Sequence, residues 1–394
     1  MSNNLRISKV DNFLFILFAF WLLVDTINGF LLRNDFPISV SQIYKTFVAI
    51  LVIVRCRNNN QVKSVFIISF VYLFFYVSIV ALNGEDVVSS IVLISKLITS
   101  LLFFAYFSQI CKADYVYFKR KAFFVIKWSF IIFSANLLAG SLGFGFSSYD
   151  FSEDEGFGSR GFFYAINELS GVLAVLYAWA IYFCKNLFSF EKYLICCVVL
   201  FFLAFTLSTK SGIIATAIFF LYITYSYGNK KEKVFVICAL MIIVVSAAVI
   251  VQIILSSDIP LFRRISYGVD RNSVLDALTS NRLQYWEEES KDFANADYIS
   301  RIFGIGGNRT VEMDPFDALL NCGILGLLVL FYLYFKALFK PISRKYKKLR
   351  YNKVIHISNC LLILMSIGGG HILFSSMAGM LIALSNALLP YRRT

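Results

Sequence analysis

The sequence predicts an all-α polytopic membrane protein with about 12 transmembrane helices, and three observations lead to this fold class. Of the 394 residues, 59% are hydrophobic and only 15% are charged, whereas soluble domains are about 45–50% apolar and about 25% charged. The mean hydropathy is +0.72. Twelve helices of about 20 residues would use roughly 240 residues, close to the apolar share of the chain. This composition excludes disordered, collagen-like and coiled-coil proteins and ordinary cytosolic enzymes.

Twelve apolar runs give the expected helices in order. The first run follows a short basic segment, as in a signal peptide, but it has no small-residue cleavage site at its end, so we expect an uncleaved helix. The runs are 13–32, 38–55, 64–82, 87–108, 122–140, 164–184, 193–209, 211–227, 234–255, 316–335, 354–372 and 374–390. Their boundaries are least distinct within 193–227 and 354–390, where the connections are very short.

These runs divide the chain into three parts. Residues 1–255 contain the first nine helices and a short external loop at 141–163. Residues 256–315 form one large external loop, in which we expect short helices. Residues 316–394 contain the last three helices and a basic cytoplasmic loop at 336–353.

The distribution of charge predicts the orientation in the membrane, because cytoplasmic loops are enriched in Lys and Arg. With the N-terminus in the cytoplasm, the inner segments hold 24 basic and four acidic residues, whereas the outer segments hold 10 basic and 17 acidic residues. We therefore expect both termini in the cytoplasm and the large loop outside. The net charge of +13 follows from this topology and requires no nucleic-acid partner.

Some charged residues lie within the apolar runs, where a charge at a helix centre costs about 2.5–3.5 kcal/mol. Asp25 and Lys45 lie at similar depths in neighbouring helices, so we expect an ion pair. Lys96 either pairs with Glu168 or binds an anionic ligand, and the sequence leaves both alternatives open. Small residues such as Gly323 are expected to permit close helix packing.

The large loop contains a readable helix that starts at Arg282. Asn281 is a suitable N-cap for it. Arg282 would lie on one face with Trp286 and other aromatic residues, and a guanidinium in the first turn of a helix favours a phosphate group. The alternative is a buried pair between Arg282 and Glu289.

Four further cations are candidate ligands of a diphosphate on the outer face. Lys210 stands at the start of a helix, where backbone N–H groups favour anions. Arg160 lies among glycines that let a backbone approach a ligand. Arg264 and Arg309 belong to the large loop.

Two carboxylates precede the tenth predicted helix and are the candidate catalytic residues. Asp314 stands before Pro315, a pattern typical of a helix N-cap, which leaves Glu312 without a structural role. Cations would offset the charge that grows on a diphosphate leaving group, and a carboxylate would accept the proton of an attacking sugar hydroxyl. We see no acidic pair or Cys/His cluster with metal-ligand spacing, so we expect metal-independent chemistry without a cofactor.

At these residues the chain resembles the superfamily of O-antigen polymerases (Wzy-type) and O-antigen ligases, which are bacterial envelope glycan enzymes. The local marks are GSRGFFYAINELSG (158–171), STKSGIIAT (208–216) and IFGIGGN with VEMDPFDALLNCGILG (302–326). The resemblance implies an inner-membrane glycosyltransferase with a GT-C-like helical fold. Its substrate would be an undecaprenyl-diphosphate-linked oligosaccharide on the periplasmic side, and its partners a chain-length regulator and a flippase. Arg160, Arg282 and Lys210 match the family's diphosphate-binding residues by local context.

The function expected from this resemblance is that of an O-antigen polymerase, which joins lipid-linked repeat units. One alternative is a ligase that transfers finished polymer to lipid A core. Ligases commonly have a His shortly before the corresponding helix, where this chain has Glu312, and the outer segments contain no His because His371 is at a helix end. Another alternative is a flippase, but a transporter should concentrate polar residues at midplane in broken helices.

Overall fold

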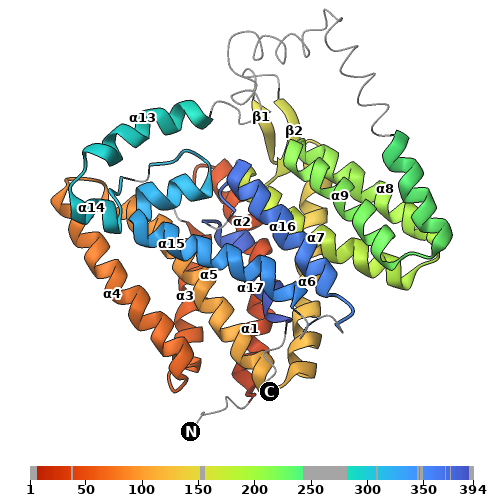
Figure 1. The fold of residues 1–394 in the computed structure, drawn as a ribbon, viewed down its shortest axis with the longest axis horizontal. Coiled ribbons are helices and arrows are strands. Elements are labelled where there is room, and N and C mark those ends of the chain that lie inside the picture. Colours follow the sequence, from red (N-terminus) through yellow and green to blue (C-terminus); the bar gives the residue numbers. More distant parts are fainter. Residues whose placement is uncertain are drawn as a thin grey trace, which may run out of the picture.

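The computed structural model describes residues 7–36, 39–150, 156–242, 282–307, 309–343, 346, 349–368, 370–372 and 374–389. These residues are mostly helical and include one two-stranded hairpin (Figure 1). The elements are α1 (Lys9–Ala19), α2 (Trp21–Arg33), α3 (Val40–Arg55), α4 (Asn60–Leu82), α5 (Val87–Ala113), α6 (Tyr115–Ser141), β1 (Phe146–Asp150), β2 (Gly156–Gly161), α7 (Ile166–Leu187), α8 (Phe190–Leu207), α9 (Lys210–Tyr227), α13 (Arg282–Asn295), α14 (Tyr298–Phe303), α15 (Asp314–Ile342), α16 (Asn352–Gly368) and α17 (Ser376–Ala387). Residues 230–242 are also helical.

The lengths and compositions of these helices support a membrane protein. Six of the described helices, α4, α5, α6, α7, α8 and α15, are long and apolar enough to cross a membrane, and the bent pair α1–α2 makes seven if it is one span. Each predicted run contains helical residues, although the ninth is described only as far as residue 242. Because α16 and α17 are shorter apolar helices, the predicted twelve spans are not confirmed.

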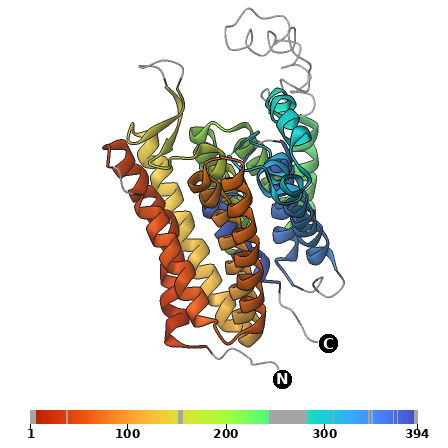
Figure 2. The same ribbon diagram turned by 90° about the vertical axis from the view of Figure 1, so that its left-hand side faces the viewer.

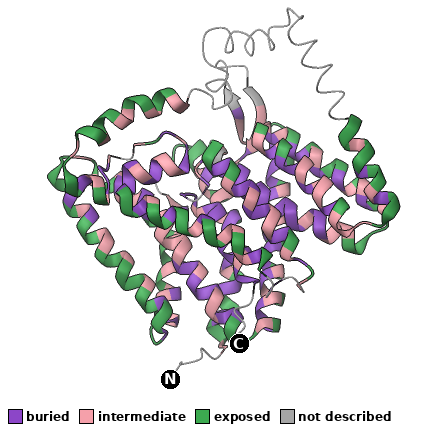
Figure 3. Cartoon of the chain, viewed as in Figure 1, coloured by how far each residue is buried: buried purple, intermediate pink, exposed green. Residues whose placement is uncertain are grey.

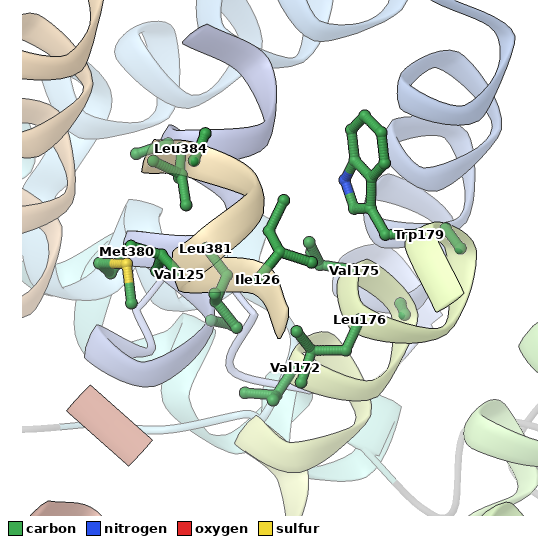
Figure 4. Packing of buried hydrophobic residues seen from close by; sticks show 14 of the residues in the cluster. Val125, Ile126, Val172, Val175, Leu176, Trp179, Met380, Leu381 and Leu384 are labelled. Carbon is green, nitrogen blue, oxygen red and sulfur yellow. The ribbon is translucent and has the colours of Figure 1, made fainter. Parts of the chain in front are cut away.

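Helix α7 lies at the centre of the hydrophobic core. In the most apolar 18-residue stretch of α7, 78% of the residues are buried, against 17% in the corresponding stretch of α4. Figure 3 shows the same contrast. Val172, Val175, Leu176 and Trp179 of α7 pack with residues of α6 and α17 (Figure 4). Helix α4, in contrast, presents large apolar side chains such as Phe70 and Phe74 to its surroundings, as expected of a helix that faces lipid. The core therefore lies where α6, α7 and α17 meet.

The predicted ion pairs within the apolar segments are present. Lys45 Nζ lies 2.6 Å from Asp25 Oδ1, which confirms that pair. Lys96 Nζ lies 3.2 Å from Glu168 Oε1, which is the first of the two alternatives left open for Lys96. These charges are thus paired within the protein, as their cost in an apolar medium requires.

Helix α15 is broken at Gly323, whose backbone is left-handed (φ 65°, ψ −167°). A Cβ at this position would collide with the carbonyl oxygen of Ile302, at the end of α14. Gly323 therefore permits the close packing of α14 against this helix, as predicted, and it also breaks the helix at that crossing, which the sequence did not predict. A second break separates α16 from α17; we call its described residues, 370–372, 374 and 375, the α16–α17 break.

Both predicted external loops contribute elements to the same end of the molecule, opposite the start of α1 (Figures 1 and 2). In the predicted loop 141–163, β1 pairs antiparallel with β2. The helix predicted to start at Arg282 is confirmed as α13 (Arg282–Asn295), whereas its predicted cap, Asn281, lies outside the described residues.

Candidate active site

The backbone of Glu312 is strained and is held by the α16–α17 break. Glu312 has a φ of 61°, a left-handed conformation that is uncommon for residues with a side chain. Its carbonyl oxygen accepts a hydrogen bond from the Gly370 N–H at 2.8 Å, and Met313 forms a parallel bridge with Gly370. The segment before α15 is therefore positioned by residues much later in the chain.

The carboxylate of Asp314 contacts the same break. Met313 is the N-cap of α15 and Asp314 is its first residue, so the predicted N-cap role of Asp314 is wrong. Asp314 Oδ2 instead accepts a hydrogen bond from the Ile372 N–H at 3.2 Å. Asp317 Oδ1 accepts one from the Val311 N–H at 2.6 Å, which orders the segment that leads into the helix. Both carboxylates are fully buried.

Arg282 binds Glu312. The Nη2 and Nε atoms of Arg282 donate to Glu312 Oε2 at 2.9 and 3.3 Å. The alternative partner, Glu289, accepts a bond from Arg309 at 3.0 Å instead, so the Arg282–Glu289 pair is wrong. Glu312 also has a partner that the sequence did not reveal. The side chain of Arg282 is 16% exposed and that of Glu312 is 43% exposed, which leaves this carboxylate accessible to a substrate.

His371 is the residue that sequence reasoning missed. Its Nδ1 lies 3.3 Å from Asp317 Oδ2, and one ligand atom each of Asp314, Asp317 and His371 lie within 4.8 Å of one another. The sequence feature that could have indicated His371 as a site residue is the run of three glycines directly before it, which interrupts the apolar sequence.

The Lys96–Glu168 pair contacts the α16–α17 break, which contains His371. Ser375, the N-cap of α17, donates to Glu168 Oε2 at 2.6 Å. The charges of Glu168, Glu312, Lys96 and Arg282 all act on the imidazole of His371. We call the set of side chains gathered here the His371 cluster. Its members are Lys96, Glu168, Arg282, Glu312, Asp314, Asp317 and His371.

The other cations predicted to bind a diphosphate are not members of the His371 cluster. The Arg160 guanidinium lies 5.2 Å from the Phe146 ring centroid and donates to the Tyr164 carbonyl, so these contacts place it at the hairpin. Lys210 is exposed at the first position of α9. Arg264 lies outside the described residues.

Arg309 is surrounded by carboxylates. It lies 2.9 Å from Glu85 and 3.0 Å from Glu289, and it also pairs with Asp292. Although its partial burial alone would lower the pKa of Arg309, the hydrogen bonds to Glu85, Asp292 and Glu289 raise this pKa above its ordinary value. Arg309 thus joins α13 to the turn between α4 and α5. This geometry favours a structural role over the predicted binding of a diphosphate.

The arrangement combines a cation that can turn towards an anion, an accessible carboxylate and an imidazole at the ends of apolar helices. Such a site can bind a negatively charged group and accept a proton. Comparison with known proteins adds no family to this description, because no protein-family model, curated protein or solved structure matches the chain.

Proposed function

We propose that this chain is a bacterial inner-membrane glycosyltransferase that joins undecaprenyl-diphosphate-linked oligosaccharide repeats into O-antigen or a similar surface polysaccharide. The observation that carries the proposal is the Arg282–Glu312 pair beside His371 in a helical membrane protein. A guanidinium binds a phosphate group with two parallel hydrogen bonds, and the apolar helices suit a substrate with a long lipid tail. The resemblance of segments 158–171, 208–216 and 302–326 supports the same class of substrate.

The mechanism follows from the competition of two anions for Arg282. A bound diphosphate would draw the guanidinium away from Glu312, because it offers more negative charge than one carboxylate. The bond between the sugar C1 and the diphosphate oxygen then breaks, and Arg282 offsets the charge that develops on the leaving group. The hydroxyl of a second lipid-linked repeat forms the new bond to C1 and gives its proton to Glu312. Donor binding thereby releases the base that the transfer requires.

The proposal includes twelve membrane spans, with both termini in the cytoplasm and the His371 cluster at the periplasmic side. The asymmetry of charge between the two sets of loops supports this orientation, and so does the position of the hairpin and α13 at one end of the molecule.

Cysteine labelling from outside should test this topology. Asn295 and Lys231 are both exposed, so a cysteine at either position would react equally well if reagent reached it. In a background without the eight native cysteines, a membrane-impermeant maleimide should label Asn295→Cys and miss Lys231→Cys. External labelling of Lys231→Cys would contradict the orientation, and permeabilised cells supply the control in which both react.

His371 favours the ligase as a second candidate. The preference for a polymerase rested partly on the absence of His from the outer segments, and the structure brings His371 beside the residues that precede α15. A ligase would transfer finished polymer to lipid A core with the same chemistry at the sugar C1.

The third candidate, a flippase, is favoured by the breaks in the helices. Transporters often bind substrate where membrane helices are interrupted, and this chain has interruptions at Gly323 and between α16 and α17. One gene-deletion experiment, described next, separates the polymerase, ligase and flippase activities.

Deletion of the gene, followed by analysis of lipopolysaccharide on a gel, is the decisive experiment. For a polymerase we expect lipid A core that carries one repeat, restored to long chains by the wild-type gene. Bare core with polymer retained on the carrier lipid would identify a ligase. Bare core with single lipid-linked repeats retained on the cytoplasmic side would identify a flippase.

A further inference from the structure

We propose that Asp314, Asp317 and His371 bind a divalent transition-metal ion of the Zn²⁺ or Mn²⁺ type. The proposal stands on the geometry of these side chains, and it remains if the proposed glycosyl transfer fails.

The three ligands are brought together by ordered backbone contacts. Asp314 and Asp317 lie three residues apart in the first turn of α15, a spacing that places them on one helix face. His371 belongs to the α16–α17 break, which is held against that turn by the Gly370–Glu312 and Ile372–Asp314 hydrogen bonds. The ligand atoms already lie within 4.8 Å of one another, so little rearrangement is needed to bind an ion.

Two buried polar atoms that lack hydrogen bonds indicate that Asp317 and His371 share a ligand. The Asp317 side chain is 0% exposed, yet its Oδ2 forms no hydrogen bond within the described part of the chain. His371 Nδ1, 3.3 Å away, forms none there either. A buried polar atom without a hydrogen bond destabilises the folded protein, and a carboxylate buried without a cation does so more strongly. A metal ion would satisfy both atoms at once.

The donor set selects the kind of ion. One imidazole nitrogen and two carboxylate oxygens suit Zn²⁺ and Mn²⁺, whereas Mg²⁺ prefers oxygen ligands and retains several waters. Three protein ligands leave at least one coordination position for water or another group. An ion here would fasten the α16–α17 break to the first turn of α15 and fix the orientation of His371.

The test uses the full-length protein, purified in detergent and stripped of metal with a chelator. We expect calorimetry with Zn²⁺ and electron paramagnetic resonance with Mn²⁺ to detect one bound ion, and Zn²⁺ to raise the melting temperature. Asp317→Asn should weaken binding at least tenfold, because its amide oxygen can still accept the Val311 hydrogen bond but the negative charge is lost. His371→Ala should weaken binding at least as much.

Two further variants make the result specific. Asp297→Asn removes a carboxylate that caps α14, outside the three ligands, and should bind metal as the wild type does. His371→Cys should retain Zn²⁺ and lose Mn²⁺, because a thiolate favours the softer ion. The proposal is overturned if the folded wild type binds neither ion saturably, or if Asp317→Asn and His371→Ala bind with unchanged stoichiometry and affinity.

Discussion

Replacing Arg282 with alanine should abolish polymer while the protein remains at its normal level in the membrane. The variant leaves Glu312 without this cation, but the carboxylate is 43% exposed, so water can solvate it and the loss of an ion pair of this kind costs about 0–1 kcal/mol. A bound diphosphate, in contrast, loses the group that offsets its developing charge, which typically lowers the rate by about 10²–10³-fold. Chain length on a gel, read beside a membrane blot, measures both effects.

Two matched variants distinguish this role from a structural one. Arg282→Lys should restore polymer only in part, because an ammonium lacks the planar fork of the guanidinium. Arg309→Ala removes a cation from the same region but leaves Glu85, Glu289 and Asp292 to repel one another. We therefore expect Arg309→Ala to lower the melting temperature, with any loss of polymer following the loss of protein. Long chains from Arg282→Ala would contradict the proposed role, as would its disappearance from the membrane.

The positions of the helices were predictable because apolar residues must be continuous to cross a membrane. The Asp25–Lys45 pair was predictable for a similar reason, since two charges at equal depth in neighbouring helices stabilise one another. The break at Gly323 was not, because it lies where Ile302 approaches too closely for a side chain, a contact that no local pattern encodes. The short lengths of α16 and α17 likewise depend on where the chain is interrupted.

The candidate site was predictable only as separate residues. Arg282 and Glu312 were each singled out, but their pairing depends on the path between α13 and α15. Asp314 was interpreted as a cap because Pro315 follows it, whereas its carboxylate contacts Ile372 in a distant segment. His371 was set aside as the end of a helix. A parallel bridge and two hydrogen bonds, all formed between distant segments, determine that it lies in the site.

The substitution Glu312→Gln should stop chains at one repeat without lowering the amount of protein. Glutamine has the shape of glutamate, and its carbonyl oxygen can still accept a hydrogen bond from Arg282, so the segment before α15 should keep its structure. The amide cannot accept a proton at neutral pH, however, and general base catalysis typically contributes about 10²–10⁴-fold to the rate. Glu312→Asp keeps a base on a shorter side chain and should retain part of the activity. The measurement is the chain-length distribution beside a membrane blot.

The control for Glu312→Gln is Asp297→Ala, which removes the carboxylate that caps α14. Asp297 Oδ1 accepts hydrogen bonds from the N–H groups of Ile299 and Ser300 at the start of α14, and loss of such a cap costs about 0.5–2 kcal/mol. We expect Asp297→Ala to melt at a lower temperature and still make long chains, the reverse of the Glu312→Gln result. Long chains from Glu312→Gln would remove Glu312 from the mechanism.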